Sequence, residues 1–261
     1  MANLTFLGSG GFFAPEGNFH SNMVLEADSG MNLLIDCGSD IRHSLRAAGY
    51  GWNDIDAIYV SHLHDDHAGG LEAMGFASKF IKNDKPYLIA HESLMDPLWI
   101  NKLAISLMVL SQARYELSDY FKVKPVKKSF NWEGISFNLV PVIHVVNNEM
   151  GHVYSFGLFF TVNGKKVYIT TDMSYSDLEI KRSDWDFDKQ WQYYERADII
   201  FHECETSAQP SGVHAHYDFL TEFPEHIKRK MWLYHYGDTS GRDPKRDGFA
   251  GFVERGQVFP L

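Results

Sequence analysis

Cysteine is nearly absent from this chain, which has only Cys37 and Cys204 among its 261 residues. Two cysteines cannot build the disulfide framework on which small secreted domains depend. The N-terminal sequence MANLTFLGSGGFF lacks the basic and apolar regions of a signal peptide, and no apolar run reaches the roughly 20 residues of a membrane helix. These absences predict a cytoplasmic protein that does not enter a membrane.

Basic residues are also few, with 24 Lys and Arg against 34 Asp and Glu, so the formal net charge is −10. Proteins that bind extended nucleic acid through its phosphates usually present a basic surface, so a partner of that kind is not expected. A small anionic substrate is compatible with this charge, because bound metal ions offset negative charge locally.

Low-complexity tracts and Pro- or Ser-rich linkers are absent as well, and the length fits a single domain over residues 1–261. Apolar runs rich in β-branched and aromatic residues predict strands at 4–7, 22–27, 31–36, 56–60, 86–90, 134–141, 153–162, 165–171, 198–202 and 231–234. Helical spacing predicts helices at 41–48, 71–81 and 220–230. Strands followed by helices, occurring roughly twice, predict an α/β sandwich made of two β-rich halves.

Residues 92–120 have a different texture, because Leu and Ile recur there at mixed helical spacing with few turn signals. This pattern predicts a helical insertion of one or two helices. Such an insertion could cap a site or mediate dimerisation, and we expect a homodimer. An ordinary core helix is the alternative.

The stretch SHLHDDHAGG at residues 61–70 concentrates three histidines and two aspartates between His62 and His67. It directly follows the apolar run 56–60, which predicts a buried strand ending at the mouth of a sheet, where sites are commonly built. The alternation of His62 and His64 places both rings on one side of the loop. A chance polar loop is the less favoured interpretation.

A second metal would fit Asp66 and His67 better, because these sequence neighbours point elsewhere, whereas Asp65 is expected to orient a histidine. Two divalent metals need about seven or eight protein ligands, so this loop supplies only part of the set. The other candidates each follow an apolar strand directly, as a site at the edge of a sandwich requires. They are His144, Asp172, His202 and His235.

Together these motifs resemble the metallo-β-lactamase superfamily, in which a loop like SHLHDDH precedes a His, an Asp and a His in the order of His144, Asp172 and His235. The resemblance spans nearly the whole chain and implies a four-layered αβ/βα sandwich with a dinuclear metal centre. It implies that one metal is bound by His62, His64 and His144, that the other is bound by Asp66, His67 and His235, and that Asp172 bridges them. His152 is the alternative to His144.

The segments FLGSGG at 6–11, LLIDCG at 33–38 and HECET at 202–206 are similar to the branch that contains RNase Z and small phosphodiesterases. In that branch a glutamate and a histidine outside the metal ligands act as a proton-donating pair. Matching by order and position points to Glu203 and His214. Glu205 and His216 are the alternative pair.

The expected activity is hydrolysis by a hydroxide bridged between two divalent metals, with a nucleotide or a related small phosphodiester as the substrate. Asp66, Glu203 and His214 are the expected catalytic groups, since a histidine held by a carboxylate can protonate a poor alkoxide leaving group. Zinc is the expected metal, and manganese or iron is also compatible with these ligands.

Two other activities of the same fold stay open, namely hydrolysis of thioesters or lactones and tRNA 3′ processing. The residues after His235 depart from RNase Z, and no basic arm is evident unless residues 92–130 replace it, which disfavours tRNA. A redox iron protein is less favoured because no flavin-binding domain is attached, and a non-catalytic module because the ligand set is complete. Aromatic residues such as Phe12, Phe13 and Trp191 could stack on a base, with a place in the core as the alternative.

Overall fold

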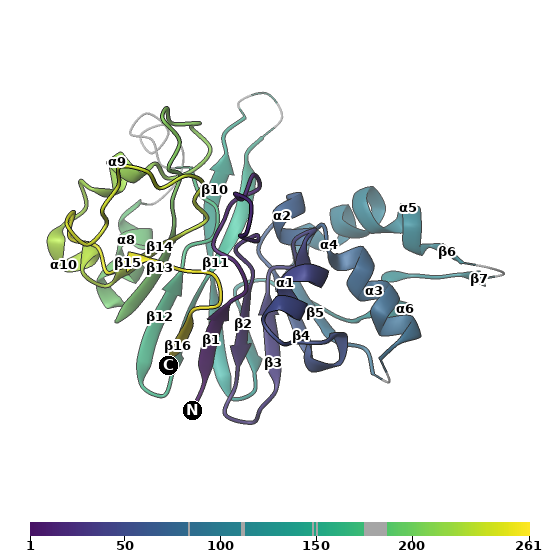
Figure 1. Cartoon of the computed structure of the whole chain (residues 1–261). Coiled ribbons are helices and arrows are strands. Elements are labelled where there is room, and N and C mark those ends of the chain that lie inside the picture. The colour runs from purple at the N-terminus through teal and green to yellow at the C-terminus, as the bar shows by residue number, and fades with distance from the viewer. Residues whose placement is uncertain (83, 111–112, 148, 150, 175–186) are drawn as a thin grey trace. The chain divides into compact units, whose positions relative to one another are not determined.

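The computed structural model describes residues 1–261 except 83, 111–112, 148, 150 and 175–186 (Figure 1). The chain divides into two compact units, each with its own seven-stranded sheet. The first unit comprises Met1–Gly8, Asn18–Lys128 and Arg255–Leu261, and the second comprises Ser9–Gly17 and Ser129–Glu254. The α/β class is confirmed, and the assignment of the whole chain to one domain stays a prediction. Among the described residues, no helix is both long and apolar enough to cross a membrane.

The sheet of the first unit is mixed. Its order is β16 (Val258–Pro260), β1 (Asn3–Phe6), β2 (Met23–Glu26), β3 (Asn32–Ile35), β4 (Ala57–Val60), β5 (Tyr87–His91) and β8 (Lys122–Val126). The pairs from β16 to β3 are antiparallel, and the pairs from β3 to β8 are parallel. The carboxyl ends of β3, β4 and β5 therefore lie at one edge of the sheet, where loops build sites.

Helices cover one face of this sheet (Figure 1). They are α1 (Ile41–Ala47), the 3₁₀ helix η1 (Trp52–Asp54), α2 (Asp65–Ala68), α3 (Leu71–Phe80) and the helices of residues 92–120. Alternate strand residues point to this face. Val24, Leu34, Ile58 and Leu88 thus form one buried cluster with Met74 of α3.

Residues 92–120 are helical in their first part. α4 (Glu92–Pro97), the π-helix η2 (Leu98–Leu103) and α5 (Ala104–Leu107) follow one another, then the antiparallel strands β6 (Val109–Leu110) and β7 (Ala113–Arg114), then α6 (Leu117–Tyr120). Leu98, Leu103 and Leu107 lie in the core cluster of the first unit, whereas Ile105 is exposed. Core packing therefore accounts for much of the leucine spacing. The predicted insertion includes residues 111–112, which lie outside the described residues.

The sheet of the second unit combines antiparallel and parallel pairs. Its order is β15 (Gly251–Phe252), β14 (Met231–Tyr234), β13 (Ile199–Glu203), β12 (Lys165–Ile169), β11 (Val153–Val162), β10 (Ile135–Val145) and β9 (Ser129–Trp132). The pairs from β9 to β12 are antiparallel, and those from β12 to β15 are parallel. The carboxyl ends of β12, β13 and β14 share one edge, where three predicted site residues follow.

In the described part of this unit, the helices that pack on the second sheet are α8 (Phe187–Arg196), α9 (Tyr217–Leu220) and α10 (Glu225–Lys228). The predicted helix 220–230 is wrong in extent, because Pro224 has no amide hydrogen and stands as the N-cap of α10 instead of continuing α9. Among the aromatic residues considered for stacking, Trp191 packs against the core of this unit. It does not line the pocket that contains Phe12 and Phe13.

Candidate metal and catalytic centre

Three histidine rings lie together after β4 in the first unit. His62 is fully buried, His67 is buried in α2, and His64 is exposed between them. The ring centroids of His62 and His64 are 4.8 Å apart, and those of His62 and His67 are 4.2 Å apart. Oδ2 of the buried Asp66 lies 3.4 Å from Nε2 of His67. The structure therefore brings the four predicted ligands of this loop together.

Asp36 fixes this loop from the end of β3. Its Oδ1 accepts a hydrogen bond from the Ser61 amide at 2.8 Å, and its Oδ2 accepts one from the Ser61 hydroxyl at 2.8 Å. Oδ2 also lies 2.8 Å from Nδ1 of His67. Because the carboxylate accepts, Nδ1 of His67 carries the hydrogen and the lone pair of the ring is on Nε2. His67 in this tautomer presents Nε2 to a metal.

The orienting role that the sequence suggested for Asp65 belongs to Asp36. Asp65 is exposed, and its Oδ1 lies 3.4 Å from Nζ of Lys102. An aspartate directly after an apolar strand predicts Asp172 as a site residue, and Asp36 follows β3 in the same way. Applied to that strand, the same criterion would have found Asp36.

Asp172 is the centre of a second cluster, which lies in the second unit. It is buried after β12, and its Oδ2 is 3.7 Å from Nε2 of His144 on β10. Its Oδ1 is 3.4 Å from Nε2 of His235, the residue after β14. Nδ1 of His144 lies 2.9 Å from the Val213 carbonyl, which can only accept a hydrogen bond. The lone pair of His144 is therefore on Nε2, on the side of Asp172.

Both clusters fit divalent metal ions in chemistry and in spacing. Zinc binds imidazole nitrogen and carboxylate oxygen at about 2.1 Å, so two ligands at the corners of a tetrahedron stand about 3.4 Å apart. The Nε2-to-oxygen separations are 3.4 Å for His67 and Asp66, 3.4 Å for His235 and Asp172, and slightly wider at 3.7 Å for His144 and Asp172. Imidazoles with a fixed Nδ1 hydrogen beside buried carboxylates are a donor set suited to such ions.

Glu203 and His214 meet beside the second cluster. Glu203 ends β13 and is fully buried, and its Oε1 accepts hydrogen bonds from the amides of Met173 at 3.0 Å and Ala215 at 2.8 Å. Its other oxygen, Oε2, lies 3.3 Å from Nδ1 of His214. The same nitrogen is 3.8 Å from Oδ2 of Asp172. Two backbone amides therefore hold the carboxylate so that its second oxygen faces His214.

The surroundings of His214 favour its protonated form. Burial by itself lowers the pKa of this ring, but the nearby carboxylates of Glu203, Asp172 and Glu205 outweigh that effect and raise the pKa of His214 to about 9. The ring is thus a cation at neutral pH. A divalent metal ion on Asp172 would reduce this rise, because like charges repel.

The alternative pair, Glu205 and His216, has structural partners instead. The Glu205 carboxylate accepts hydrogen bonds from the amide of Ser211 at 2.9 Å and from its hydroxyl at 2.9 Å. His216 is the N-cap of α9, where its Nδ1 accepts a hydrogen bond from the Asp218 amide at 3.3 Å. The geometry therefore favours the first pair as neighbours.

Two further histidines considered from the sequence face elsewhere. The His202 ring lies in the core, with Nε2 2.9 Å from the Tyr194 hydroxyl and Nδ1 2.6 Å from the Glu203 carbonyl oxygen. His152, the alternative to His144, has its ring against Tyr154, with centroids 6.4 Å apart. Neither belongs to the groups of potential metal-binding side chains in the described part of the chain.

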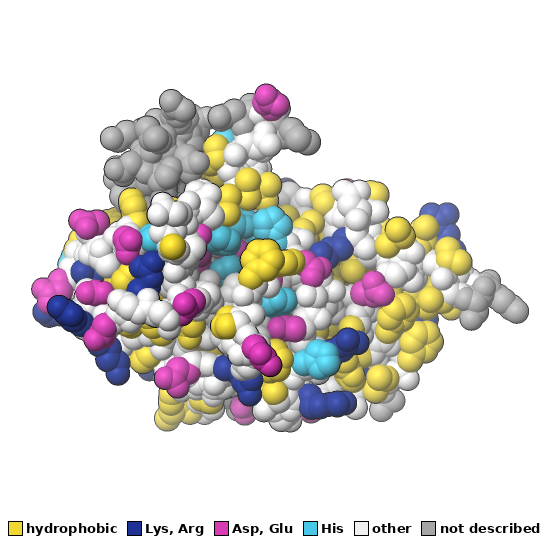
Figure 2. All heavy atoms as spheres, turned by 45° about the horizontal axis from the view of Figure 1, so that its top comes forward, with side chains coloured by type: hydrophobic (Ala, Val, Ile, Leu, Met, Phe, Trp, Pro, Cys, Tyr) yellow, Lys and Arg dark blue, Asp and Glu magenta, His cyan; other side chains and the backbone are white. Residues whose placement is uncertain are grey.

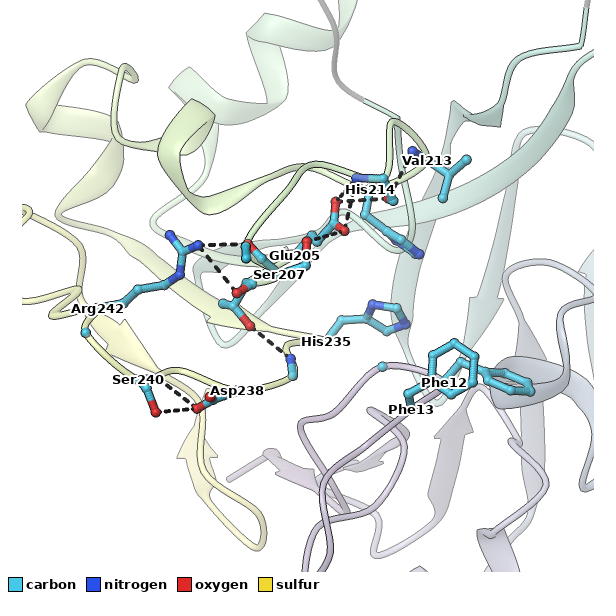
Figure 3. A pocket seen from close by; sticks show the side chains of 16 residues that line it. Phe12, Phe13, Glu205, Ser207, Val213, His214, His235, Asp238, Ser240 and Arg242 are labelled. Atoms are coloured by element: carbon cyan, nitrogen blue, oxygen red, sulfur yellow. Dashed lines mark hydrogen bonds between the residues drawn. The ribbon is translucent and has the colours of Figure 1, made fainter.

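A pocket of about 730 Å³ opens beside His214 and His235 in the second unit (Figure 3). Phe12 and Phe13 lie next to His235, and Arg242 lies across the pocket from them (Figure 3). This volume is typical of a site for a small molecule.

Three strand ends share an unusual backbone conformation. Asp36 after β3, Thr171 after β12 and His235 after β14 have positive φ angles of 61°, 57° and 66°. Residues other than glycine rarely adopt this region, and a β-branched residue such as Thr171 is strained there. Strained backbone tends to occur at functional sites, and here it lies at His235, next to Asp172, and at Asp36, which is hydrogen-bonded to His67.

Comparison with known proteins agrees with this organisation. The model of the family described as anti-Pycsar protein Apyc1 matches residues 2–259. A protein of that name from Paenibacillus harenae is 32% identical over 256 residues, which are 97% of both chains. The metallo-β-lactamase fold protein YhfI from Bacillus subtilis superposes with a TM-score of 0.72 at 18% identity, over 99% of this chain and 98% of that one. Human tRNase Z, short form, superposes with a TM-score of 0.70 at 19% identity, over 99% and 98%. The predicted fold is thereby confirmed as the metallo-β-lactamase fold, and the chain belongs to the family of anti-Pycsar protein Apyc1.

Proposed function

We propose that the protein is a metal-dependent phosphodiesterase that acts on a nucleotide or a related small phosphodiester. One observation carries the proposal: a buried glutamate, Glu203, lies 3.3 Å from His214 beside the cluster of Asp172 and His235. A proton donor next to potential metal ligands suits the cleavage of an ester whose leaving group is a poor one.

The proposed ligands are those that the resemblance implies. His62, His64 and His144 would hold one metal ion, Asp66, His67 and His235 the other, and Asp172 would serve both. Zinc is the proposed metal, with manganese or iron as alternatives. When bound, these ions would make water a stronger nucleophile and stabilise the charge that builds on the phosphoryl group.

His214 and Glu203 supply the chemistry that this chain performs with its own side chains. With Nδ1 turned to Glu203, the protonated ring has a second hydrogen, on Nε2, that it can donate to the departing alkoxide. Glu203 stabilises the cation before the transfer and keeps the ring oriented. A positioned acid of this kind typically contributes about 10²- to 10⁴-fold in rate.

Charge and pocket size support a small substrate. The chain carries a net charge of −10, and Figure 2 shows exposed Lys and Arg side chains interspersed with Asp and Glu side chains. A surface of this kind does not favour an extended phosphate backbone. A cyclic or modified nucleotide fits the pocket beside His214, and tRNA is the weaker candidate. The relatives are named anti-Pycsar proteins, and we propose that role for this chain too.

The test is hydrolysis of two diesters, bis(p-nitrophenyl) phosphate and adenosine 3′,5′-cyclic phosphate, by metal-replete and chelated protein. We expect turnover of both by the replete protein and loss of both on chelation. His214→Ala should slow the cyclic nucleotide more than the aryl ester, because p-nitrophenolate leaves without help from an acid.

The matched control is His216→Ala, which removes a helix cap and should leave the rate of the folded protein unchanged. If the metal-replete wild type cleaves neither diester, the phosphodiesterase proposal is wrong. Thioesters and lactones are then the substrates to assay.

A further inference from the structure

Two adjacent phenylalanines are exposed on the segment Ser9–Gly17. The Phe12 side chain is 50% exposed and that of Phe13 is 89% exposed. Their rings meet edge to face, with centroids 4.9 Å apart and an interplanar angle of 76°. Single exposed apolar residues are common on protein surfaces, but two neighbouring rings on the wall of a pocket are a feature of binding sites.

The backbone beneath these rings is fixed beside His235. The Ser9 carbonyl accepts hydrogen bonds from the amides of His235 at 2.8 Å and Tyr236 at 3.2 Å, and the Ser9 hydroxyl donates to the Tyr236 hydroxyl at 2.9 Å. A β-carbon on Gly11 would lie 3.0 Å from Cε1 of His235, so glycine permits the close approach of this backbone to the ring. The segment is thus anchored within three residues of the exposed pair.

The polar groups across the pocket are already engaged within the protein. Arg242 donates hydrogen bonds to the Asp218 carboxylate at 2.7 Å and to the Ser207 carbonyl at 3.1 Å. The Glu205 carboxylate accepts hydrogen bonds from Ser211. These bonds stiffen the wall opposite Phe12 and Phe13, and the two aromatic rings offer a large apolar surface to a ligand in this pocket.

We propose that Phe12 and Phe13 form a stacking surface that binds the planar ring of the substrate in this pocket. The inference rests on the proposed function, since it assigns the ring of a nucleotide to the side of His235 away from Arg242 (Figure 3). Rings that stack on such side chains bind through their π faces and through water released from both surfaces. The pair acts in binding, while proton transfer stays with His214.

The experiment compares two cyclic phosphates that differ only in the base. One is adenosine 3′,5′-cyclic phosphate, and the other is methyl β-D-ribofuranoside 3′,5′-cyclic phosphate, which has no base. Steady-state constants are measured for the metal-replete wild type, Phe12→Ala, Phe13→Ala and the double variant. We expect KM for the adenosine compound to rise about 10-fold or more in the double variant, with kcat within about twofold. Both constants for the base-free compound should stay unchanged.

Phe80→Ala is the matched control, because Phe80 is 66% exposed on α3 and does not line the pocket. This variant should leave KM and kcat unchanged for both substrates. If the Phe12 and Phe13 variants change the kinetic constants equally for both substrates, or for neither, the proposed stacking surface is wrong. A change in molecular mass of the double variant in solution would overturn it too, because the rings would then serve contact between copies of the chain.

Failure of the proposed function gives a different result. If the wild type cleaves neither compound, the stacking surface is tested by calorimetric titration of the wild type and the double variant. The ligands are adenosine 5′-monophosphate and ribose 5-phosphate. Tighter binding of the adenosine compound by the wild type, lost in the double variant, would support the surface without phosphodiesterase activity. Equal binding of both ligands would overturn it.

Discussion

Glu203 and His214 face each other across 3.3 Å, yet one is fully buried and the other is partly exposed. The buried partner is held by two backbone amides, and the exposed partner lines a pocket. A charge fixed in the interior therefore controls the protonation of a group that a substrate can reach. This division of roles is common to general acids whose pKa is raised by a neighbouring carboxylate.

Glu203→Gln should weaken this control. The amide keeps the shape of the side chain but loses the charge that stabilises the His214 cation, so the pKa of His214 should fall. We expect kcat for adenosine 3′,5′-cyclic phosphate to drop by about 10²-fold and kcat for bis(p-nitrophenyl) phosphate to drop much less. The measurement is kcat for the two substrates at several pH values. Equal losses of kcat for the two substrates would show that Glu203 acts in a step before the leaving group departs.

Asp36→Ala should lower metal affinity without removing a proposed ligand. The substitution frees the His67 ring and removes the acceptor for both hydrogen bonds of Ser61. We expect metal affinity to fall by about 10- to 100-fold, which a competition titration against a chromogenic chelator would measure. The matched control is Asp65→Ala in the same loop, which should bind metal like the wild type. A loss as large in that control would contradict the role given to Asp36.

Removal of the metal should also destabilise the fold. Ions that bind only the folded chain add to its free energy of unfolding, and at 100 times the dissociation constant they add about 2.7 kcal/mol. We therefore expect the melting temperature to fall on chelation and to recover when zinc is returned. Calorimetry at a fixed protein concentration measures both steps. A melting temperature unaffected by chelation would mean that no metal is bound.

Thr171 allows a test of backbone strain. Its φ angle is 57°, and its buried hydroxyl has no hydrogen-bond partner among the residues that the structure describes. Thr171→Gly and Thr171→Ala remove the same hydroxyl, but only glycine adopts this backbone without strain. We expect the glycine variant to exceed the alanine variant in free energy of unfolding by about 1 kcal/mol in urea titrations. The reverse order would indicate that this strand end is not strained.

His202 should make the fold sensitive to acid. Burial lowers the pKa of His202 from 6.5 to about 4, against a smaller opposing effect of its hydrogen bond to the Glu203 carbonyl. The unfolded chain therefore binds a proton between these values and the folded chain does not. Stability from this residue is complete above about pH 6.5 and decreases as the pH falls towards 4.

The expected loss from His202 is about 2 kcal/mol by pH 5. Urea titrations at pH 7.5 and pH 5 measure it, with His202→Gln as the comparison because glutamine does not titrate. The difference in unfolding free energy between wild type and variant should shrink at the lower pH. If this difference does not depend on pH, His202 does not control the loss of stability in acid.

The strands and most of the candidate site could be predicted because their signals are local. An apolar run ending in a coordinating residue describes His144, Asp172 and His235, and parallel pairing places the ends of β12 and β14 at one edge. Asp36 follows its strand in the same way, but it acts by hydrogen bonding to a loop 25 residues away. Such a role depends on tertiary contacts, which a single sequence does not contain.

Aromatic residues illustrate the remaining limit. Phe12 and Phe13 are exposed, whereas Trp191 packs against the core of the second unit. Phenylalanine and tryptophan side chains are both suited to a core and to an exposed binding surface. An apolar side chain gains free energy from burial, but its sequence position does not show whether neighbouring residues in the fold will bury it. The helix predicted over 220–230 failed for a different reason, since Pro224 was within the predicted span and should have ended it.

The segment Ser9–Gly17 belongs to a different unit from the residues on either side of it in the sequence. Its flanking residues belong to the first unit, while the segment itself belongs to the second, so the chain passes between the units at residues 8–9, 17–18, 128–129 and 254–255. A gene fragment starting at residue 129 would encode the Glu203 and His214 pair without Phe12 and Phe13. Neither unit can therefore be transferred by recombination as one continuous piece, and a chimaera that exchanges the second unit must also exchange nine residues near the start.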